Sequence, residues 1–292
     1  MTQISFCSTN YNTSDVTRES LESVLGHAQG IEHEVVIVDN FSDDGSYEAL
    51  KSFAPSVPLI LEQHRCTRGR GRQIAFARSR GEYVVTFDLD TVYNEDWGRL
   101  LRWVLDTRIP FGLSAQFSQF YPREALAQVG GWRDLQYWED VDLWARLAAI
   151  GRYRTYPVIC GENRKRVPGR TPVAKALRLY ARARDKIALA DWIPFRLYFQ
   201  GYLALLRSSQ RSRTAYPLGV LLPAYVAGRR KRGRLYPEGK GPSVLADPRL
   251  FLDVRLVPSE RLVPLTTEYD TLAGCEGALE RGDLGFLPGT YD

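Results

Sequence analysis

Residues 68–92 read RGRGRQIAFARSRGEYVVTFDLDTV, and this stretch decides the predicted fold. We expect a helix from Arg70 to Arg80 that ends at Gly81, since glycine is common just past a helix C-terminus. The apolar run Tyr83–Phe87 then predicts a buried strand. The sequence Asp88-Leu89-Asp90 follows this strand directly. In an extended chain alternate side chains point the same way, so both carboxylates should project from one side of the strand end.

The same alternation of strand and helix extends in both directions from this stretch. Short connections between the elements favour a mostly parallel sheet covered by helices on both faces, which is an α/β fold. We expect strands at residues 4–8, 34–38, 57–62, 83–87, 112–120 and 153–159. We expect helices at residues 15–25, 46–53, 70–80, 95–107, 122–129 and 138–150.

The chain divides into three parts by composition. The first domain is predicted to cover residues 1–162, because residues 161–172 are rich in Arg, Gly and Pro and break the pattern. Residues 163–235 form a basic, partly apolar appendage, with helices expected at 173–190 and 194–207 and a second apolar stretch at 215–228. Residues 236–292 contain many Gly, Pro and acidic residues and are expected to be mostly irregular.

The excess positive charge is confined to the appendage. The whole chain has 39 Lys and Arg against 34 Asp and Glu, for a net charge of +5. Residues 164–234 hold 18 of the basic residues and only two acids, Asp185 and Asp191, so the remainder of the chain carries a net charge of −11. A basic block of this kind favours an anionic partner, whether lipid headgroups, phosphates or nucleic acid.

Cysteine usage and hydropathy favour a cytoplasmic protein. The four cysteines, Cys7, Cys66, Cys160 and Cys275, form no C-x-x-C pair, and the histidines do not complete a zinc-binding pattern. We therefore expect reduced, mostly buried thiols. The chain opens without a signal-peptide pattern, and no apolar run approaches the ~20 residues of a membrane-spanning helix.

Acidic residues follow two of the predicted parallel strands, at the edge where open α/β sheets bind ligands. Asp39 comes directly after the run EVVIV, where its carboxylate can accept hydrogen bonds from a nucleotide base or ribose. Asp88 and Asp90 supply two hard oxygen ligands that suit Mg²⁺ or Mn²⁺. The alternatives are ordinary turn chemistry for Asp39 and a chance D-x-D sequence for the pair.

A third acidic group opens the helix predicted at 138–150. Glu139 and Asp140, with Asp142, lie in its first turn. Acids at this position can simply complement the helix dipole. The functional interpretation is a general base that takes a proton from an attacking hydroxyl.

Four motifs in order make residues 1–160 resemble the family-2 inverting glycosyltransferases, which have the GT-A fold. The motifs are STNYN (8–12), VVIVDNFSDDGS (35–46), the stretch at 68–92 quoted above, and GGWRDLQYWEDVDLWARLAAIG (130–151). The resemblance implies a Rossmann-like GT-A domain over residues 1–162. It also implies a nucleotide-sugar donor and a divalent cation, Mg²⁺ or Mn²⁺.

The resemblance also implies a role for each matching residue. Asp140 would be the catalytic base, and Glu139 would help to hold the donor sugar or the acceptor. Asp90 would ligate the metal, and Asp88 would lie near the metal and the ribose. The donor nucleotide would lie against Thr9, Asn10, Tyr11, Asp39, Arg68, Arg72 and Asp88. The sugar and acceptor pocket would include Gly130, Gly131, Trp132 and Trp138.

The sequence also departs from the family pattern. The proline common before the threonine of the opening motif is missing, and Leu89 stands at the middle of the D-x-D, where the side chain points away. No Q-x-x-R-W motif follows the predicted base, which argues against a processive polysaccharide synthase. The run GRGRQ lacks the third glycine of a dinucleotide-binding fingerprint.

These observations predict a non-processive, metal-dependent, inverting glycosyltransferase that uses a UDP-, GDP- or dTDP-linked donor. The basic appendage favours a peripheral position on the inner face of the cell membrane and a lipid-linked acceptor. Packing of the appendage on the catalytic domain, or in a homodimer, is the alternative. The rival functions are a nucleotidyltransferase on a related fold and a protein that binds nucleic acid or an anionic surface; the lack of a recognisable module pattern disfavours nucleic acid.

Overall fold

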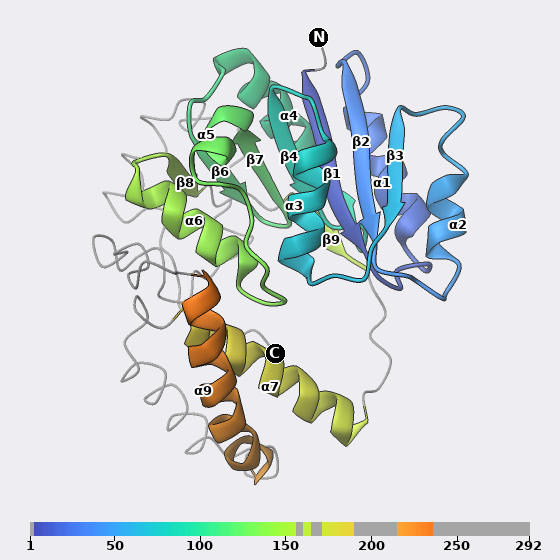
Figure 1. Cartoon of the computed structure of the whole chain (residues 1–292). Coiled ribbons are helices and arrows are strands. Elements are labelled where there is room, and N and C mark those ends of the chain that lie inside the picture. The colour runs from blue at the N-terminus through green and yellow to red at the C-terminus, as the bar shows by residue number, and fades with distance from the viewer. Residues whose placement is uncertain (1–2, 156–159, 165–170, 190–214, 236–292) are drawn as a thin grey trace, which may run out of the picture.

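The structure is a computed structural model of the chain, and it describes residues 3–155, 160–164, 171–189 and 215–235 (Figure 1). Three of the cysteines, Cys7, Cys66 and Cys160, are free thiols in it. Cys275, the helix predicted at 194–207 and the irregular tail predicted at 236–292 lie outside the described residues.

A seven-stranded sheet forms the centre of the molecule, with the strand order β3-β2-β1-β4-β7-β6-β8. Strands β3, β2, β1 and β4 are parallel, β7 is antiparallel to both β4 and β6, and β8 is parallel to β6. This confirms the predicted, mostly parallel α/β sheet. Its strands are β1 (Ile4–Asn10), β2 (His33–Asp39), β3 (Leu59–Gln63), β4 (Tyr83–Phe87), β6 (Gly112–Ala115), β7 (Ser118–Pro122) and β8 (Tyr153–Thr155).

Helices cover both faces of the sheet, and the strand sequences explain why. Alternate residues of a strand point to opposite faces, and here both sets are apolar. Phe6 of β1 and Ile37 of β2 pack in the core with α1 and α4, whereas Cys7 and Val36 pack on the other face with α3, α5 and α6. These helices are α1 (Thr17–His27), α3 (Arg68–Arg78), α4 (Glu95–Thr107), α5 (Arg123–Gln128) and α6 (Glu139–Ala149), and the short α2 (Ser46–Lys51) follows β2.

The register of the parallel strands brings their last residues into line. Asn10 at the end of β1 pairs with Asp39 at the end of β2, which in turn pairs with Gln63 at the end of β3. Strand β4 ends at Phe87, so Asp88 leaves the sheet at the same edge. Polar side chains from four strands therefore meet at one edge, and Figure 1 shows α7 and α9 beyond it.

Two expectations about strands were wrong. The strand predicted at 112–120 is a hairpin of β6 and β7, in which Phe117 adopts a left-handed φ of 62°. This turn contains neither glycine nor proline, so the sequence gives no turn signal. The break predicted at 161–172 begins with a short strand, β9 (Gly161–Asn163), which pairs with β5 (Thr91–Tyr93) and ends one residue past the predicted domain boundary at 162.

Two helices represent the basic appendage in the described part of the chain. They are α7 (Pro172–Ala188) and α9 (Ala215–Leu235), and they pack against each other. Helix α9 continues through Pro223 and includes the basic run 229–234. Among the helices described, none has both the length and the apolar character that crossing a membrane requires.

The N-terminal part of α3 approaches its neighbours closely because it contains glycine. The Gly69 N–H donates to the Leu135 carbonyl oxygen at 2.8 Å, and a Cβ on Gly69 would overlap the carbonyl oxygen of Arg133. Likewise, a Cβ on Gly71 would stand 2.8 Å from Cγ2 of Thr9. The two glycines of RGRGRQ therefore let α3 contact both β1 and the loop before α6.

This close approach predicts that Gly69→Ala destabilises the protein by about 1–3 kcal/mol, because backbone atoms must move to admit the methyl group. Gly26→Ala is the matched control: Gly26 lies in α1 with nothing within 4 Å of its added Cβ. That variant should gain up to ~1 kcal/mol from helix propensity. Urea unfolding measures both free energies, and equal effects of the two substitutions would contradict the close packing of α3.

Candidate functional site

A buried arginine on α3 lies at the centre of the site. The side chain of Arg72 is only 6% exposed, and its guanidinium contacts three carboxylates. It donates to Oδ1 of Asp140, lies 3.6 Å from Oε1 of Glu139, and reaches Oδ1 of Asp88 at 3.4 Å. Arg68, one turn earlier on the same helix, lies 3.6 Å from the same Glu139 oxygen. The cluster thus joins α3, the end of β4 and the start of α6.

The charges of this cluster leave it net negative when every group is ionised. Two guanidiniums, Arg68 and Arg72, face three carboxylates. Burial alone lowers the pKa of Arg72, but the three carboxylates outweigh burial and raise that pKa, so the guanidinium stays protonated. A buried cation with this many partners fixes its neighbours firmly, since removing one partner leaves another charge uncompensated.

Glu139 is the carboxylate most affected by its surroundings. Burial, and next the charge of Asp140, raise the pKa of Glu139 from 4.5 to about 7, although Arg68 and Arg72 lower it. The side chain is 3% exposed, at the first residue of α6. Near neutral pH this residue therefore exchanges a proton.

Asp140 is held from two sides and lies closer to the surface. Its Oδ1 accepts hydrogen bonds from Arg72 and from the indole nitrogen of Trp132, the latter at 3.1 Å. Within the described residues, no hydrogen bond to its second oxygen is recorded. The backbone N–H of Trp132 donates to the side chain of Gln73 at 2.7 Å, so α3 also fixes the indole. Both of these hydrogen bonds thus hold the same oxygen of the Asp140 carboxylate.

Asp39 is fully buried and its carboxylate is engaged by the protein itself. It accepts hydrogen bonds from the Asn10 side chain at 2.8 Å, from the Gln63 side chain at 3.0 Å, and from the backbone N–H and hydroxyl of Ser42 at 3.0 and 2.5 Å. The Asn10 amide also reaches Ser46. In this structure Asp39 therefore ties together the ends of β1, β2 and β3; a direct contact with a nucleotide would have to replace one of these bonds.

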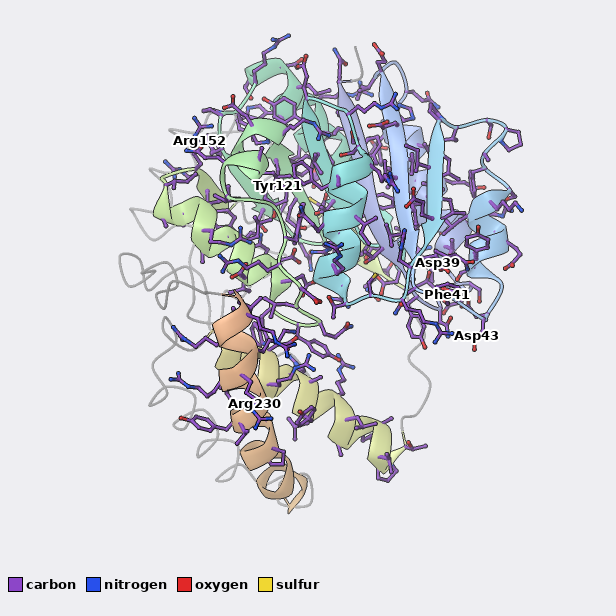
Figure 2. All side chains as sticks on the ribbon, viewed as in Figure 1. Asp39, Phe41, Asp43, Tyr121, Arg152 and Arg230 are labelled. Carbon is purple, nitrogen blue, oxygen red and sulfur yellow. The ribbon has the colours of Figure 1, made fainter. Side chains whose placement is uncertain are left out.

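Exposed aromatic side chains follow the same two strands. Tyr11 comes after β1 and Phe41 after β2, and both are largely exposed. Phe41 (labelled in Figure 2) has a left-handed φ of 55°. The guanidinium carbon of Arg65 lies over its ring, 5.1 Å from the ring centroid. Neither Phe41 nor Arg65 was among the residues predicted for the site, although Phe41 stands inside the motif VVIVDNFSDDGS.

Asp88 and Asp90 flank a buried leucine. Leu89 is almost fully buried, while the Asp88 side chain is 42% exposed, so the middle residue points inward as expected. Within the described residues, no three acidic, histidine or cysteine side chains form a group that could hold a metal ion. The protein therefore offers two carboxylates here, which fits Mg²⁺ or Mn²⁺ only if phosphate or water oxygens complete the coordination.

The sequence of residues 5–108 matches the family described as Glycosyl transferase family 2. The match covers just over a third of the chain, and over this segment the sequence is similar to that family. Over 88 residues the chain is also 33% identical to the uncharacterized glycosyltransferase YfnE of Bacillus subtilis (strain 168). That match covers 30% of this chain and 22% of the relative, so it spans less than a quarter of YfnE.

Solved glycosyltransferase structures share the fold. The mannosyltransferase PcManGT from Pyrobaculum calidifontis, in complex with GDP-Man and Mn²⁺, superimposes with a TM-score of 0.51 at 19% identity, covering 84% of this chain and 77% of PcManGT. S. aureus TarS 1–349 in complex with UDP-GlcNAc gives a TM-score of 0.50 at 14% identity, covering 88% of this chain and 82% of that one. The GT-A fold predicted from the family-2 motifs is confirmed.

The residues predicted from family-2 motifs fall into separate groups in the structure. One group surrounds Arg72: Arg68, Asp88, Trp132, Glu139 and Asp140. A second surrounds Asp39 and includes Asn10. Thr9 packs beside Gly71, and the glycines Gly130 and Gly131 form a left-handed turn before Trp132. Trp138 instead turns toward α7, where its indole nitrogen donates to the Arg182 carbonyl oxygen at 3.3 Å.

The residue that holds the loop before α6 was not predicted from the sequence. Asp185 of α7 is fully buried, and its Oδ2 accepts the backbone N–H groups of Gln136 and Tyr137 at 2.8 and 3.1 Å. Its Oδ1 pairs with Arg184 at 2.7 Å and with Lys231 of α9 at 3.1 Å. The available signal was that Asp185 is one of only two acids in a strongly basic segment.

The raised pKa predicts how Glu139 affects stability. Between pH 4.5 and about 7 the folded protein holds a proton on Glu139 that the unfolded chain has lost. The free energy of unfolding of the wild type, relative to Glu139→Gln, should therefore fall as pH rises through this window, by on the order of 1–3 kcal/mol. Urea unfolding across pH with EDTA present measures it. Glu124→Gln, at an exposed position, is the control, and parallel profiles for the wild type and Glu139→Gln would refute the shift.

The contacts of Asp185 predict that Asp185→Asn loosens the loop before α6. An amide offers one acceptor oxygen and no charge, so it cannot bind two N–H groups and two cations. We expect a loss of about 3 kcal/mol or more of stability and faster hydrogen exchange at Gln136 and Tyr137. Asp106→Asn, at an exposed position on α4, should change neither. Unaltered exchange in the loop of the Asp185 variant would rule out this clamp.

Proposed function

We propose that the chain is an inverting, metal-dependent, non-processive glycosyltransferase that moves a sugar from a nucleotide diphosphate donor to a hydroxyl acceptor. The observation that carries the proposal is the cluster of Asp88, Glu139 and Asp140 around Arg72. It lies at the carboxyl edge of a sheet whose first strands match the Glycosyl transferase family 2 model. PcManGT with GDP-Man and TarS with UDP-GlcNAc share the fold, which supports a nucleotide-sugar donor of the UDP, GDP or dTDP type.

The charge of the cluster supports a divalent cation. A diphosphate entering beside three carboxylates and two arginines meets a net negative site, so its approach requires added positive charge. Asp88 and Asp90 would hold Mg²⁺ or Mn²⁺, with donor phosphate oxygens completing the coordination. The cation would supply charge stabilisation to the departing nucleoside diphosphate.

The protein's own groups would perform the remaining steps. Asp140 would accept the proton of the acceptor hydroxyl through Oδ2, the carboxylate oxygen that is not bonded to Arg72 or Trp132. The hydroxyl oxygen then attacks the anomeric carbon from the face opposite the diphosphate, the bond to the diphosphate breaks, and the configuration inverts. Arg68, which is half exposed, is placed to pair with the diphosphate.

We place the nucleotide at the polar edge of the sheet, beside the ends of β1 and β2. Asp39 and Asn10 hold the ends of β1 and β2 in register, and the exposed rings of Tyr11 and Phe41 follow these ends. Aromatic faces at such a position can stack on a nucleobase. Asp39 would then act by holding the strand ends and the loop that follows β2. A direct hydrogen bond from the base or ribose to Asp39 would replace one of its present bonds to the protein.

The acceptor is proposed to be lipid-linked and to be reached from an anionic membrane surface. The basic run 229–234 lies on α9, and Arg229, Arg230 and Arg234 are exposed. Exposed cations on a helix next to an apolar stretch favour binding to anionic headgroups. The catalytic cluster lies at the edge of the sheet that faces α7 and α9 (Figure 1), so such a surface would present the acceptor near it.

The test is a screen of UDP-, GDP- and dTDP-sugars for hydrolysis of the donor, with Mn²⁺, with Mg²⁺ and with EDTA. We expect turnover with one donor class, lost in EDTA. Asp140→Asn should lower kcat by roughly 100-fold or more because the base is gone, and Asp90→Asn should raise the metal concentration needed. Asp96→Asn, at a surface position on α4, should leave turnover unchanged. Failure of every donor with both metals would overturn the proposal.

A further inference from the structure

An open pocket of about 920 Å³ lies where α7 and α9 meet the catalytic domain. It lies between the two helices and is bordered by Thr67 and Asp134 of the first domain. None of the residues of the cluster around Arg72 lines this pocket. Its lining has two kinds of surface, cationic and apolar.

Four basic side chains line the pocket: Arg184 of α7 and Arg230, Lys231 and Arg234 of α9. Asp185 balances Arg184 and Lys231 through its buried Oδ1. Arg230 (labelled in Figure 2) and Arg234 are exposed, and no ion pair of either is found among the residues that the structure describes. Even after Asp134 and Asp185 are counted, the pocket keeps a surplus of positive charge, so it suits an anionic ligand.

The remaining wall is apolar. It is formed by Tyr180 of α7 and by Pro223, Val226, Ala227 and Leu235 of α9. Val226 is 44% exposed in the structure, so this wall keeps apolar surface in contact with water. A ligand that also covers this wall gains hydrophobic stabilisation in addition to its charge contacts. The two surfaces together fit an amphiphile better than a free inorganic anion.

The pocket adjoins the proposed reaction centre through α3. Thr67 is the N-cap of α3 and directly precedes Arg68, which contacts Glu139. The Thr67 hydroxyl donates to Asp134 at 2.5 Å, and Asp134 lies two residues after Trp132, whose indole holds Asp140. A ligand anchored in the pocket would therefore lie on the side of the site where the loop before α6 approaches α3.

We propose that this pocket binds the phosphate or diphosphate group of the acceptor, together with the first part of an apolar chain attached to it. Arg230 and Arg234 would pair with the phosphate oxygens, since guanidinium groups match phosphate geometry. The apolar wall would take the chain. The assignment of this ligand as the acceptor rests on the proposed function, whereas its binding to the pocket does not.

Decyl phosphate is the probe, and calorimetric titration of the full-length protein is the measurement. Arg230→Gln should weaken binding roughly tenfold, the loss of one charge-assisted hydrogen bond, and the double variant Arg230→Gln/Arg234→Gln should weaken it further. Arg229→Gln is the matched control: it removes the same charge from the neighbouring exposed position, which does not line the pocket. It should change the affinity less than about twofold. If Arg229→Gln and Arg230→Gln weakened the binding of decyl phosphate equally, the proposal that the ligand binds in this pocket would be overturned.

Two further arms separate the sources of phosphate. Inorganic phosphate should bind more weakly than decyl phosphate, and equal affinities would contradict a role for the apolar wall. Phosphatidylcholine vesicles with and without phosphatidylglycerol test a general attraction to anionic surfaces. Binding to the anionic vesicles without any binding of decyl phosphate, or with equal dependence on Arg229 and Arg230, would replace the pocket with a diffuse charged surface. Because titration needs no donor, a failed donor screen and a failed titration are distinguishable.

Discussion

The contact of Arg72 with three carboxylates is the constraint that organises the site. These carboxylates come from the end of β4 and the start of α6, which are about fifty residues apart in sequence. Bringing them to one guanidinium requires α3 to lie close to β1 and to the loop at 133–135, and only glycine at positions 69 and 71 permits that approach. Gly69 and Gly71 thus allow α3 to pack closely against its neighbours, and this packing places the Arg72 guanidinium within reach of the three carboxylates.

The same cluster explains why the site is suited to binding rather than to stability. Buried ionic groups gain little net free energy over apolar packing, and here the carboxylates outnumber the cations. Burial is the largest cause of the raised pKa of Glu139, and the charge of Asp140 adds to it, while Arg68 and Arg72 lower that pKa without offsetting both. Added cationic charge would offset this excess of carboxylates, and Asp88 together with Asp90 at the edge of the sheet is the proposed place for it.

Sequence reasoning identified the parts of the fold that local pattern determines. The strands β1, β2 and β4 are short apolar runs with charged or turn residues at their ends, and their bounds were close to those predicted. The hairpin of β6 and β7 was missed because Phe117 turns the chain without glycine or proline. Strands β5 and β9 have three residues each, too few to show a period. Asp185 could not be placed, because its partners lie about fifty residues away and contact it through backbone N–H groups, which no side-chain pattern reports.

The family match ends at residue 108, before the loop and helix that carry Glu139 and Asp140. Trp138, the N-cap residue of that helix, has a left-handed φ of 67°, a conformation that is costly for a large side chain and persists only when its surroundings impose it. The surroundings are α7: the Asp185 carboxylate accepts the two preceding N–H groups, and the backbone carbonyl oxygen of Arg182 accepts from the Trp138 indole. Since Asp185 also holds Arg184 and Lys231 at the pocket, one buried carboxylate sets both the entry to α6 and two of the pocket's four cations. The C-terminal helices are therefore part of the site's construction.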